Sequence, residues 1–284
     1  MEVSLEQVSC PLCGAGDDRP WLQKDGFAVV RCGGCGLTYV NPRLTTDALR
    51  SLYHGQAISP TDYYVRTAEQ DGRSFAARVK LIERYREPGV LLDIGCGPGT
   101  FSVVARERGW ETVGLDLNPQ SVAHCESLGL NVVCDGFPSP QVSGRQFDVI
   151  VMNDFLEHVP DPVAVLRAAR ALLVPGGVIF ISTPDIGSIM ARVTGHRWLH
   201  LKPNEHLVYF DRRTIAEVLT RAGLHLEYVC AMGRFRNLGV ALEKVRAYGE
   251  LPSAIGRALV PAWLAERVNV PINPGDEMAV VARA

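Results

Sequence analysis

Four of the eight cysteines lie in two C-x2-C pairs near the start of the chain. The pairs are Cys10/Cys13 and Cys32/Cys35, with 18 residues between them. This spacing is typical of a four-thiolate zinc site, which has no open position for water or substrate. We therefore expect a structural zinc ion in a small ribbon over residues 1–43, and two redox-active pairs are the alternative.

A glycine-rich turn provides the second candidate for chemistry. Gly95, Gly97 and Gly99 stand between an apolar run that begins at Val90 and a helical pattern. Glycines at such a junction let a ligand approach the backbone at a helix N-terminus. The preceding Asp93 would repel a pyrophosphate but could hold a cationic amino group. This pattern favours a ligand with a positive charge.

Two further carboxylates follow the next two strand-like runs. Asp116 stands 19 residues beyond Gly97, where an acidic side chain can accept hydrogen bonds from both ribose hydroxyls. Asp135 could accept one from the exocyclic amine of adenine, and Phe137 is close enough in sequence to pack on a ring. We predict a nucleoside site; a dinucleotide-binding oxidoreductase is the alternative, although its G-x-G-x-x-G fingerprint is absent.

The elements that position these residues follow a regular alternation. From residue 89 onward, short β-branched or Leu-rich runs alternate with helical patterns, which indicates a parallel sheet with helices on both faces. Two helical stretches within residues 44–88 form a predicted connector from the ribbon. The predicted organisation is a ribbon, a helical connector and an α/β domain over residues 89–284.

The motifs DIGCGPGTF, GLDLN, CDGF, FDVIVMNDFLEHVPDP and LLVPGGVIFISTP together resemble the class I S-adenosylmethionine (SAM)-dependent methyltransferases. The resemblance implies a doubly wound, Rossmann-like sheet of seven strands whose last strand is antiparallel. It also implies that Gly95 and Gly97 lie against the methionine part of SAM. Cys96, within the turn, is expected to be a small buried filler and not a nucleophile. The residues predicted to contact the cofactor are Asp93, Gly95, Cys96, Gly97, Asp116, Leu117, Asp135, Gly136, Phe137, Asn153 and Tyr64.

The LEHVPDP string after the fourth strand is similar to that of ubiquinone-pathway O-methyltransferases, whose corresponding residues are associated with a divalent cation. The matching residues here are Asp154, Glu157 and His158. Their i, i+3, i+4 spacing would place them on one face of a helical turn, where they could hold Mg²⁺. Alternatively, Glu157 is a helix-start residue and His158 packs behind the cofactor.

An insertion of about thirty residues follows the fifth strand, and in this family such an insertion commonly covers the acceptor. We expect a lid over about residues 185–210, in which bulky side chains wall an apolar pocket and cations meet an anionic group; an ordinary packed helix is the alternative. His206 is the first candidate for a general base and His158 the second, because imidazole titrates near neutrality. His206 orienting the lid through a hydrogen bond is an equal alternative. The bulky residues are Ile189, Met190, Trp198, Leu199 and Tyr209, and the cations are Arg192, Arg197 and Lys202.

The net charge and the apolar runs of the chain limit the kinds of partner and location that we expect. A formal charge of -2, with few cations in the ribbon, disfavours nucleic-acid binding and favours a small-molecule methyl acceptor, most simply a hydroxyl, in secondary-metabolite, sugar or cofactor biosynthesis. An RNA methyltransferase, N- or C-methylation and a non-enzymatic cofactor scaffold are the alternatives. No apolar run is long enough for a membrane span and the first residues lack a signal-peptide pattern, so we expect a cytoplasmic protein. The sequence does not indicate an oligomeric state.

Overall fold

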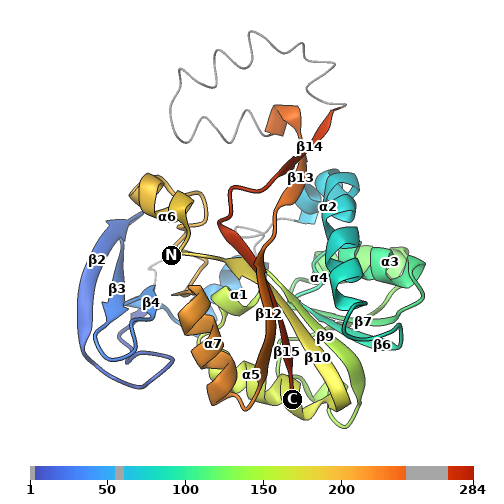
Figure 1. Cartoon of the computed structure of the whole chain (residues 1–284), viewed down its shortest axis with the longest axis horizontal. Helices are drawn as coiled ribbons and strands as arrows, with labels where there is room; N and C mark the ends of the chain where they lie inside the picture. The colour runs from blue at the N-terminus through green and yellow to red at the C-terminus, as the bar shows by residue number, and fades with distance from the viewer. Residues whose placement is uncertain (1–3, 55–60, 241–267) are drawn as a thin grey trace.

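The computed structural model of this chain describes residues 4–54, 61–240 and 268–284. Its centre is a seven-stranded sheet in the order β12-β15-β10-β9-β6-β7-β8 (Figure 1). Strand β15 pairs antiparallel with β10 and β12, whereas the pairs among β6 to β10 are parallel. The predicted doubly wound sheet with an antiparallel last strand is confirmed. The strands are β6 (Val90–Ile94), β7 (Glu111–Asp116), β8 (Asn131–Cys134), β9 (Phe147–Asn153), β10 (Leu173–Pro184), β12 (His225–Ala231) and β15 (Glu277–Arg283).

The order of the strands determines where ligands can bind. From β6 the chain runs outward through β7 to β8, then crosses back to β9 and β10 on the other side of β6. The connections after β6 and β9 therefore lead in opposite directions, and open α/β sheets bind ligands at such a switch point. These connections carry the glycine-rich turn and the segment that begins at Asp154.

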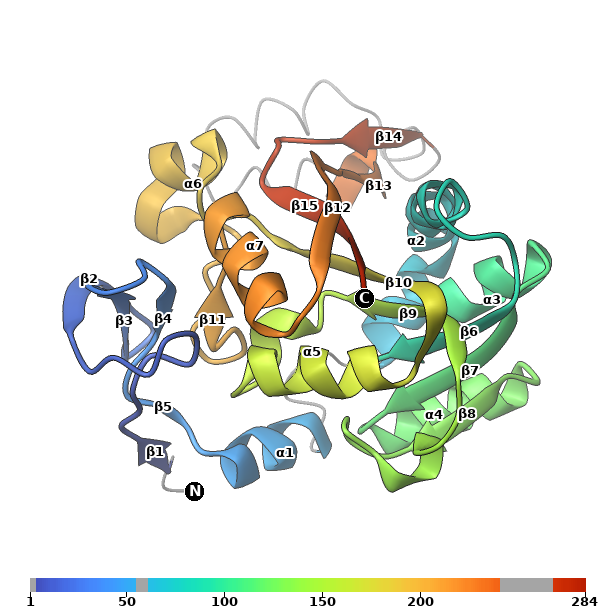
Figure 2. The same ribbon diagram turned by 60° about the horizontal axis from the view of Figure 1, so that its bottom comes forward.

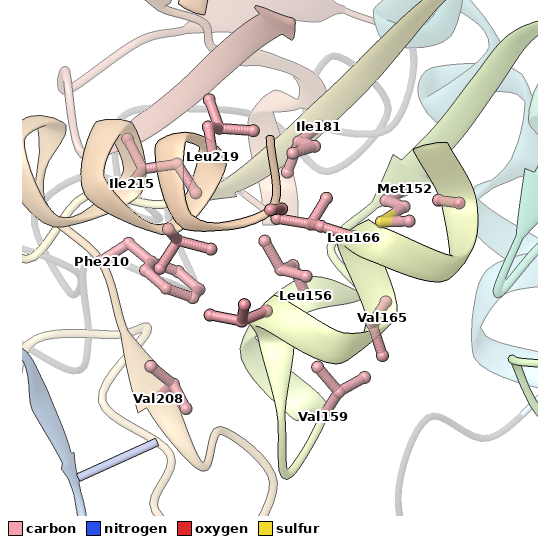
Figure 3. Packing of buried hydrophobic residues seen from close by; sticks show 14 of the residues in the cluster. Met152, Leu156, Val159, Val165, Leu166, Ile181, Val208, Phe210, Ile215 and Leu219 are labelled. Carbon is pink, nitrogen blue, oxygen red and sulfur yellow. The ribbon is translucent and has the colours of Figure 1, made fainter. Parts of the chain in front are cut away.

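Helices cover both faces of the sheet. Along β9, Val149 and Val151 belong to a core shared with α2 and α3, whereas Ile150 and Met152 belong to a core shared with α5 and α7. Figure 3 shows the second core, where Leu166 of α5 lies between Met152 of β9 and the side chains of α7. The helices are α1 (Thr46–His54), α2 (Thr61–Ile82), α3 (Thr100–Glu107), α4 (Pro119–Ser127), α5 (Pro162–Ala171), α6 (Ile189–Thr194) and α7 (Arg212–Arg221), with one-turn 3-10 helices η1 (Pro140–Val142), η2 (Leu156–His158) and η3 (Gly195–Arg197).

The N-terminal region folds as a small sheet, named here the cysteine module (residues 5–44). Strands β2 (Asp18–Lys24), β3 (Phe27–Cys32) and β4 (Thr38–Val40) form antiparallel neighbours. A fourth strand, β11 (Val208–Tyr209), comes from the insertion and pairs with β4 (Figure 2). Strand β1 (Leu5–Glu6) pairs with β5 (Arg43–Leu44). The main domain therefore completes the sheet of the module.

The insertion does not form the expected apolar wall. Trp198 and Tyr209 are buried in a cluster with Val29 and Val40 of the cysteine module, and Ile189 is 79% exposed. Strand pairing between β11 and β4 places Tyr209 in this cluster, and Trp198 packs in it as well. Among the bulky residues and cations predicted there, Leu199 and Lys202 line the cavity described below.

A second small hairpin follows β12. Strands β13 (Arg234–Asn237) and β14 (Asn269–Ile272) pair antiparallel, and β13 lies beside α2. No helix within the described residues combines the length and apolarity that crossing a bilayer requires.

Candidate active site

A cavity of about 840 Å³ opens at the carboxyl ends of β6, β7, β8 and β9. The glycine-rich turn, the segment after β9, part of α2 and part of the insertion contribute to its wall. Every residue predicted to contact the cofactor lines this cavity, and so do His158 and His206. Residues from several separate segments of the sequence therefore meet at one place.

The glycine-rich turn needs its glycines for different reasons. Gly95, Gly97 and Gly99 all have positive φ angles, of 71°, 51° and 81°. A Cβ at Gly95 would lie 2.8 Å from the ring of Phe155, whereas a Cβ at Gly97 would meet nothing within 4 Å. Gly97 therefore leaves its backbone open to the cavity, where a ligand can approach closely.

Asp93 is the most buried of the three strand-end carboxylates, with 1% exposure. Ser102 Oγ donates a hydrogen bond to it at 2.8 Å. Burial raises the pKa of Asp93 to about 7, because the charged form loses its hydration. A cationic group in the cavity would therefore stabilise the ionised carboxylate.

Asp116 holds the glycine turn and the start of α4 together. Its Oδ2 accepts a hydrogen bond from the Gly97 N–H and its Oδ1 accepts one from the Asn118 N–H, both at 2.8 Å. Each oxygen keeps a second lone pair for a ligand hydroxyl. Asp135 is also fixed, since it accepts hydrogen bonds from the Gly136 N–H and from a neighbouring serine.

Asp154 does not join Glu157 and His158 on a helical face, as the sequence had suggested. It adopts a φ angle of 49° before η2 begins, and its carboxylate lies 2.7 Å from Arg234 and 3.6 Å from Arg78. Burial alone would raise the pKa of Asp154, but the two guanidinium groups lower it to about 2. The structure therefore does not support the predicted magnesium-ligand set, because arginines already neutralise Asp154.

His206 takes the place that Asp154 was expected to occupy. Glu157, His158 and His206 each offer one atom that could bind a metal ion, and these three atoms lie within 4.8 Å of one another. Thr183 Oγ1 donates to Glu157 Oε2 at 3.0 Å, and His158 Nδ1 donates to the Glu205 carbonyl at 3.0 Å. Among the described residues, Glu157 Oε1 and His206 Nδ1 have no hydrogen-bond partner. Two imidazoles and one carboxylate are a poor set for Mg²⁺, which prefers oxygen ligands.

The protonation states in this group follow from burial. Burial, reinforced by the charge of Asp154, raises the pKa of Glu157 to about 8. Burial lowers the pKa of His158 to about 4 and that of His206 well below its usual range, with His158 adding to the second effect. Both imidazoles are therefore neutral at neutral pH, and a neutral imidazole carries one nitrogen that can accept a proton.

The four predicted cysteine ligands lie together. The sulfur of Cys10 is 3.5 Å from that of Cys35, and the sulfur of Cys13 is 3.4 Å from that of Cys32. All four sulfurs lie within 4.8 Å of one another. A zinc tetrahedron with Zn–S bonds of about 2.3 Å has sulfurs about 3.8 Å apart. The cluster is therefore compatible with a four-thiolate zinc ion.

The family model of the methyltransferase domain matches residues 66–229, more than half of the chain. The chain belongs to the methyltransferase-domain family. It is similar to two proteins named ubiquinone biosynthesis O-methyltransferase. The protein of Pseudomonas aeruginosa (strain PAO1) is 40% identical over 100 residues, which cover 33% of this chain and 43% of that protein. The protein of Xylella fastidiosa (strain 9a5c) is 34% identical over 161 residues, which cover 50% and 63%. The chain thus spans less than two thirds of the length of these relatives.

Solved structures share the fold of this methyltransferase domain at low sequence identity. A SAM-dependent methyltransferase of Thermotoga maritima, described as a possible histamine N-methyltransferase, has a TM-score of 0.54 at 16% identity, covering 83% of this chain and 99% of that chain. A SAM-dependent methyltransferase of Clostridium acetobutylicum has a TM-score of 0.51 at 13% identity, covering 78% and 94%. These similarities support the fold.

Two charged residues at or beside this site, Arg78 and Arg234, were not predicted. Arg78 of α2 is 1% exposed and donates hydrogen bonds to Asn153 Oδ1 and Ser182 Oγ, both at 2.7 Å. Arg234 of β13 bridges Asp154 and Glu277. A signal for Arg78 existed in the sequence, since it lies on the apolar stripe of its helix, where an arginine must find buried partners. No local pattern marks Arg234.

Proposed function

We propose that this chain is a SAM-dependent methyltransferase that methylates a hydroxyl group of a small molecule. The observation that carries the proposal is the cavity in which Asp93, Asp116 and Asp135, from three successive strand ends, surround an open glycine turn. Three acids at these places suit an adenosine that bears a cationic amino acid chain. The names of the curated relatives support O-methylation of a small molecule.

In this proposal, each of the three carboxylates binds a different part of the cofactor. Asp93 holds the α-ammonium group, the free lone pairs of Asp116 accept the ribose hydroxyls, and Asp135 accepts the adenine amine. Phe137 packs on the adenine ring, while Gly97 leaves room for the methionine chain. When bound, SAM supplies an electrophilic methyl group on a positively charged sulfur.

The acceptor half of the proposal is the group around His206. Bound SAM would supply the methyl group and would leave as S-adenosylhomocysteine, and His206 Nδ1 would take the proton of the acceptor hydroxyl. This nitrogen is buried and has no hydrogen-bond partner among the described residues, and His206 is one of the residues that line the cavity, so we assign the base to it. His158 is second, because its Nδ1 donates to a carbonyl. Alignment of the acceptor supplies much of the rate in such an in-line displacement.

The cysteine module holds a structural zinc ion in this proposal. All four positions of a tetrahedron are occupied by Cys10, Cys13, Cys32 and Cys35, so the ion takes no part in methyl transfer. Free thiolate ligands persist in a reducing compartment, which supports a cytoplasmic location. Elemental analysis of the purified protein should find one zinc per chain.

The proposed activity can be tested with SAM that carries a radiolabelled methyl group. The acceptor panel contains 3,4-dihydroxybenzoate for hydroxyls, histamine for amines and a transfer RNA for nucleic acid. Label in the first compound as a methyl ether supports the proposal. Label only in the amine or the RNA contradicts O-methylation of a small molecule, and failure of SAM to bind contradicts the cofactor assignment.

Replacing Asp116 with alanine is expected to weaken cofactor binding by about 1–3 kcal/mol, the scale for stranded hydrogen-bond partners. The change removes acceptors for the ribose and for the Gly97 N–H. Calorimetry with S-adenosylhomocysteine measures the loss. Glu107→Ala removes an exposed acid from α3 and serves as the control. Unchanged affinity in the Asp116 variant would refute the ribose assignment.

Cofactor affinity is expected to fall as the pH drops through about 7. Because burial raises the pKa of Asp93 to about 7, acid protonates this carboxyl and removes the charge that holds the ammonium group. Calorimetry with S-adenosylhomocysteine should show binding about tenfold weaker at pH ~6 than at pH ~8. Asp93→Asn should bind weakly with a flat profile. A sloping profile in that variant would assign the titration to another group.

A further inference from the structure

We infer that the cysteine module is a positioning element for His206, so that its metal cluster controls methyl transfer without contacting cofactor or acceptor. The inference rests on the proposed role of His206 in the reaction. No described residue of the module lines the cavity, whose wall begins in sequence at Thr46. Any effect of the module on the reaction must therefore pass through the segments that it holds in place.

The connection runs through the residue that follows His206. The N–H of Leu207 donates to the Glu157 carbonyl at 2.8 Å, and its carbonyl accepts from the Val40 N–H of the module at 2.9 Å. Leu207 is thus held on one side by the segment after β9 and on the other by β4. The backbone that carries the His206 side chain has little freedom to shift while both bonds are made.

Strand pairing extends this connection beyond a single residue. In the register of β11 with β4, Val208 is opposite Tyr39 and Tyr209 is opposite Thr38. Figure 2 shows β11 beside β4, on the side of the main domain that faces the module. A separate link comes from Arg43 of β5, whose Nη1 donates to the Pro160 carbonyl at 2.9 Å. The module therefore holds both the segment after β9 and the part of the insertion that carries His206, which come together in the part of the cavity near His206.

The metal cluster determines where β4 lies. Cys32 ends β3 and Cys35 lies in the turn that leads to β4, so the second cysteine pair is itself the turn between the two strands. The Cys32 N–H donates to the Leu37 carbonyl at 2.9 Å. The outer side of this turn is held by Arg213 of α7, whose Nη2 donates to the Cys35 carbonyl at 2.6 Å. Loss of the ion would free the turn and, with it, the position of β4.

The cofactor half of the cavity depends on other elements. Asp93 and Asp116 lie at the ends of β6 and β7, and Asp135 follows β8; these strands pair with one another and with β9. Figure 2 shows β6, β7 and β8 on the opposite side of the molecule from β2, β3 and β4. Loss of zinc should therefore lower kcat and leave cofactor affinity nearly unchanged. A module that only stabilised the whole fold would affect both.

The test replaces a zinc ligand in the full chain and compares it with a cysteine outside the cluster. Cys13→Ser removes a ligand sulfur, and Cys134→Ser, an exposed position on β8, is the matched control. Hydrogen exchange, followed by mass spectrometry, reports on peptides that cover residues 204–210 and 111–118. Calorimetry with S-adenosylhomocysteine gives cofactor affinity, and 3,4-dihydroxybenzoate is the probe for kcat and KM.

For Cys13→Ser we expect less than one zinc per chain, faster exchange in residues 204–210 and a fall in kcat of about tenfold to a hundredfold, the scale for a misplaced reacting group. Exchange in residues 111–118 and cofactor affinity should stay within about twofold of the parent protein. Equal losses of cofactor affinity and kcat would overturn the inference, as would loss of zinc with unchanged exchange in residues 204–210.

A second variant covers the case in which Cys13→Ser does not fold. Arg213→Gln removes the bond to the Cys35 carbonyl from a side chain that is 62% exposed, and Arg108→Gln, on the cofactor side, is its control. The same selective rise in exchange at residues 204–210 is expected. If the parent protein methylates nothing in the panel, the proposed function fails, while the exchange and binding measurements still decide whether the module holds this segment.

Discussion

Replacing Arg78 with methionine is expected to lower the free energy of unfolding by about 3–5 kcal/mol, the cost of leaving a buried charge without its partner. Arg78 is 1% exposed and lies 3.6 Å from both Asp154 and Glu277. It also donates hydrogen bonds to Asn153 and Ser182, at the ends of β9 and β10. Methionine fills a similar volume but removes both hydrogen bonds and the positive charge that faces Asp154 and Glu277. Urea denaturation followed by circular dichroism measures the change.

The control for this experiment is Lys80→Met, two residues further along α2. Lys80 is exposed, so its loss should change stability by no more than about 0.5 kcal/mol. A loss below about 1 kcal/mol for Arg78→Met would mean that Arg234 alone can balance both acids. In that outcome, the ion pairs of Arg234 with Asp154 and Glu277 would be stable without Arg78.

Replacing His206 with glutamine is expected to lower kcat by about 10²-fold or more, within the range for general acid–base catalysis. Glutamine can still form hydrogen bonds but cannot take a proton near neutral pH. The KM of the acceptor and the affinity for S-adenosylhomocysteine should change little, because His206 makes its main contribution as the proton moves. Single-turnover measurements with the best acceptor of the panel separate the chemical step from product release.

The pH profile provides an independent check on His206. Burial and His158 hold the pKa of His206 well below its usual range, so the base stays neutral as the pH falls through about 6.5. The activity of the parent enzyme should therefore show no decline at the usual imidazole pKa once cofactor binding is saturated. His225→Gln, on the exposed surface of β12, is the control. A kcat within about threefold of the parent for His206→Gln would show that alignment alone drives the reaction.

The predictions that held depend on short stretches of sequence. The alternation of apolar runs and helical patterns predicted the sheet, and Asp93, Asp116 and Asp135 could be placed because each stands at the end of such a run. In a parallel sheet, the carboxyl ends of neighbouring strands lie at the same edge, so local order becomes proximity. The cysteine spacing likewise predicted a cluster that the structure brings together.

The predictions that failed concern residues whose surroundings come from distant parts of the chain. The spacing of Asp154 and Glu157 suggested a shared helical face, but Arg78 and Arg234 hold Asp154 elsewhere. Of the side chains expected to wall the acceptor pocket, Trp198 and Tyr209 pack instead in a cluster with residues of the cysteine module, where β11 pairs with β4. Neither arrangement has a signal in the residues that flank it in the sequence.

The sequence by itself determined the order of strands and helices, the cofactor side of the cavity and the cysteine cluster, because each arises from the local period of apolar residues or from a fixed spacing along one turn. Only the tertiary structure determined which residues surround His206 and Asp154 on the proposed acceptor side of the cavity. His206 lies close to Glu157, and the strand that follows it, β11, pairs with β4 of the cysteine module. Asp154 is neutralised by Arg78 of α2 and Arg234 of β13, which are distant from it in the sequence. The physical reason is that burial makes each charge there require a partner, and the fold, through long-range packing, selects which partner is near.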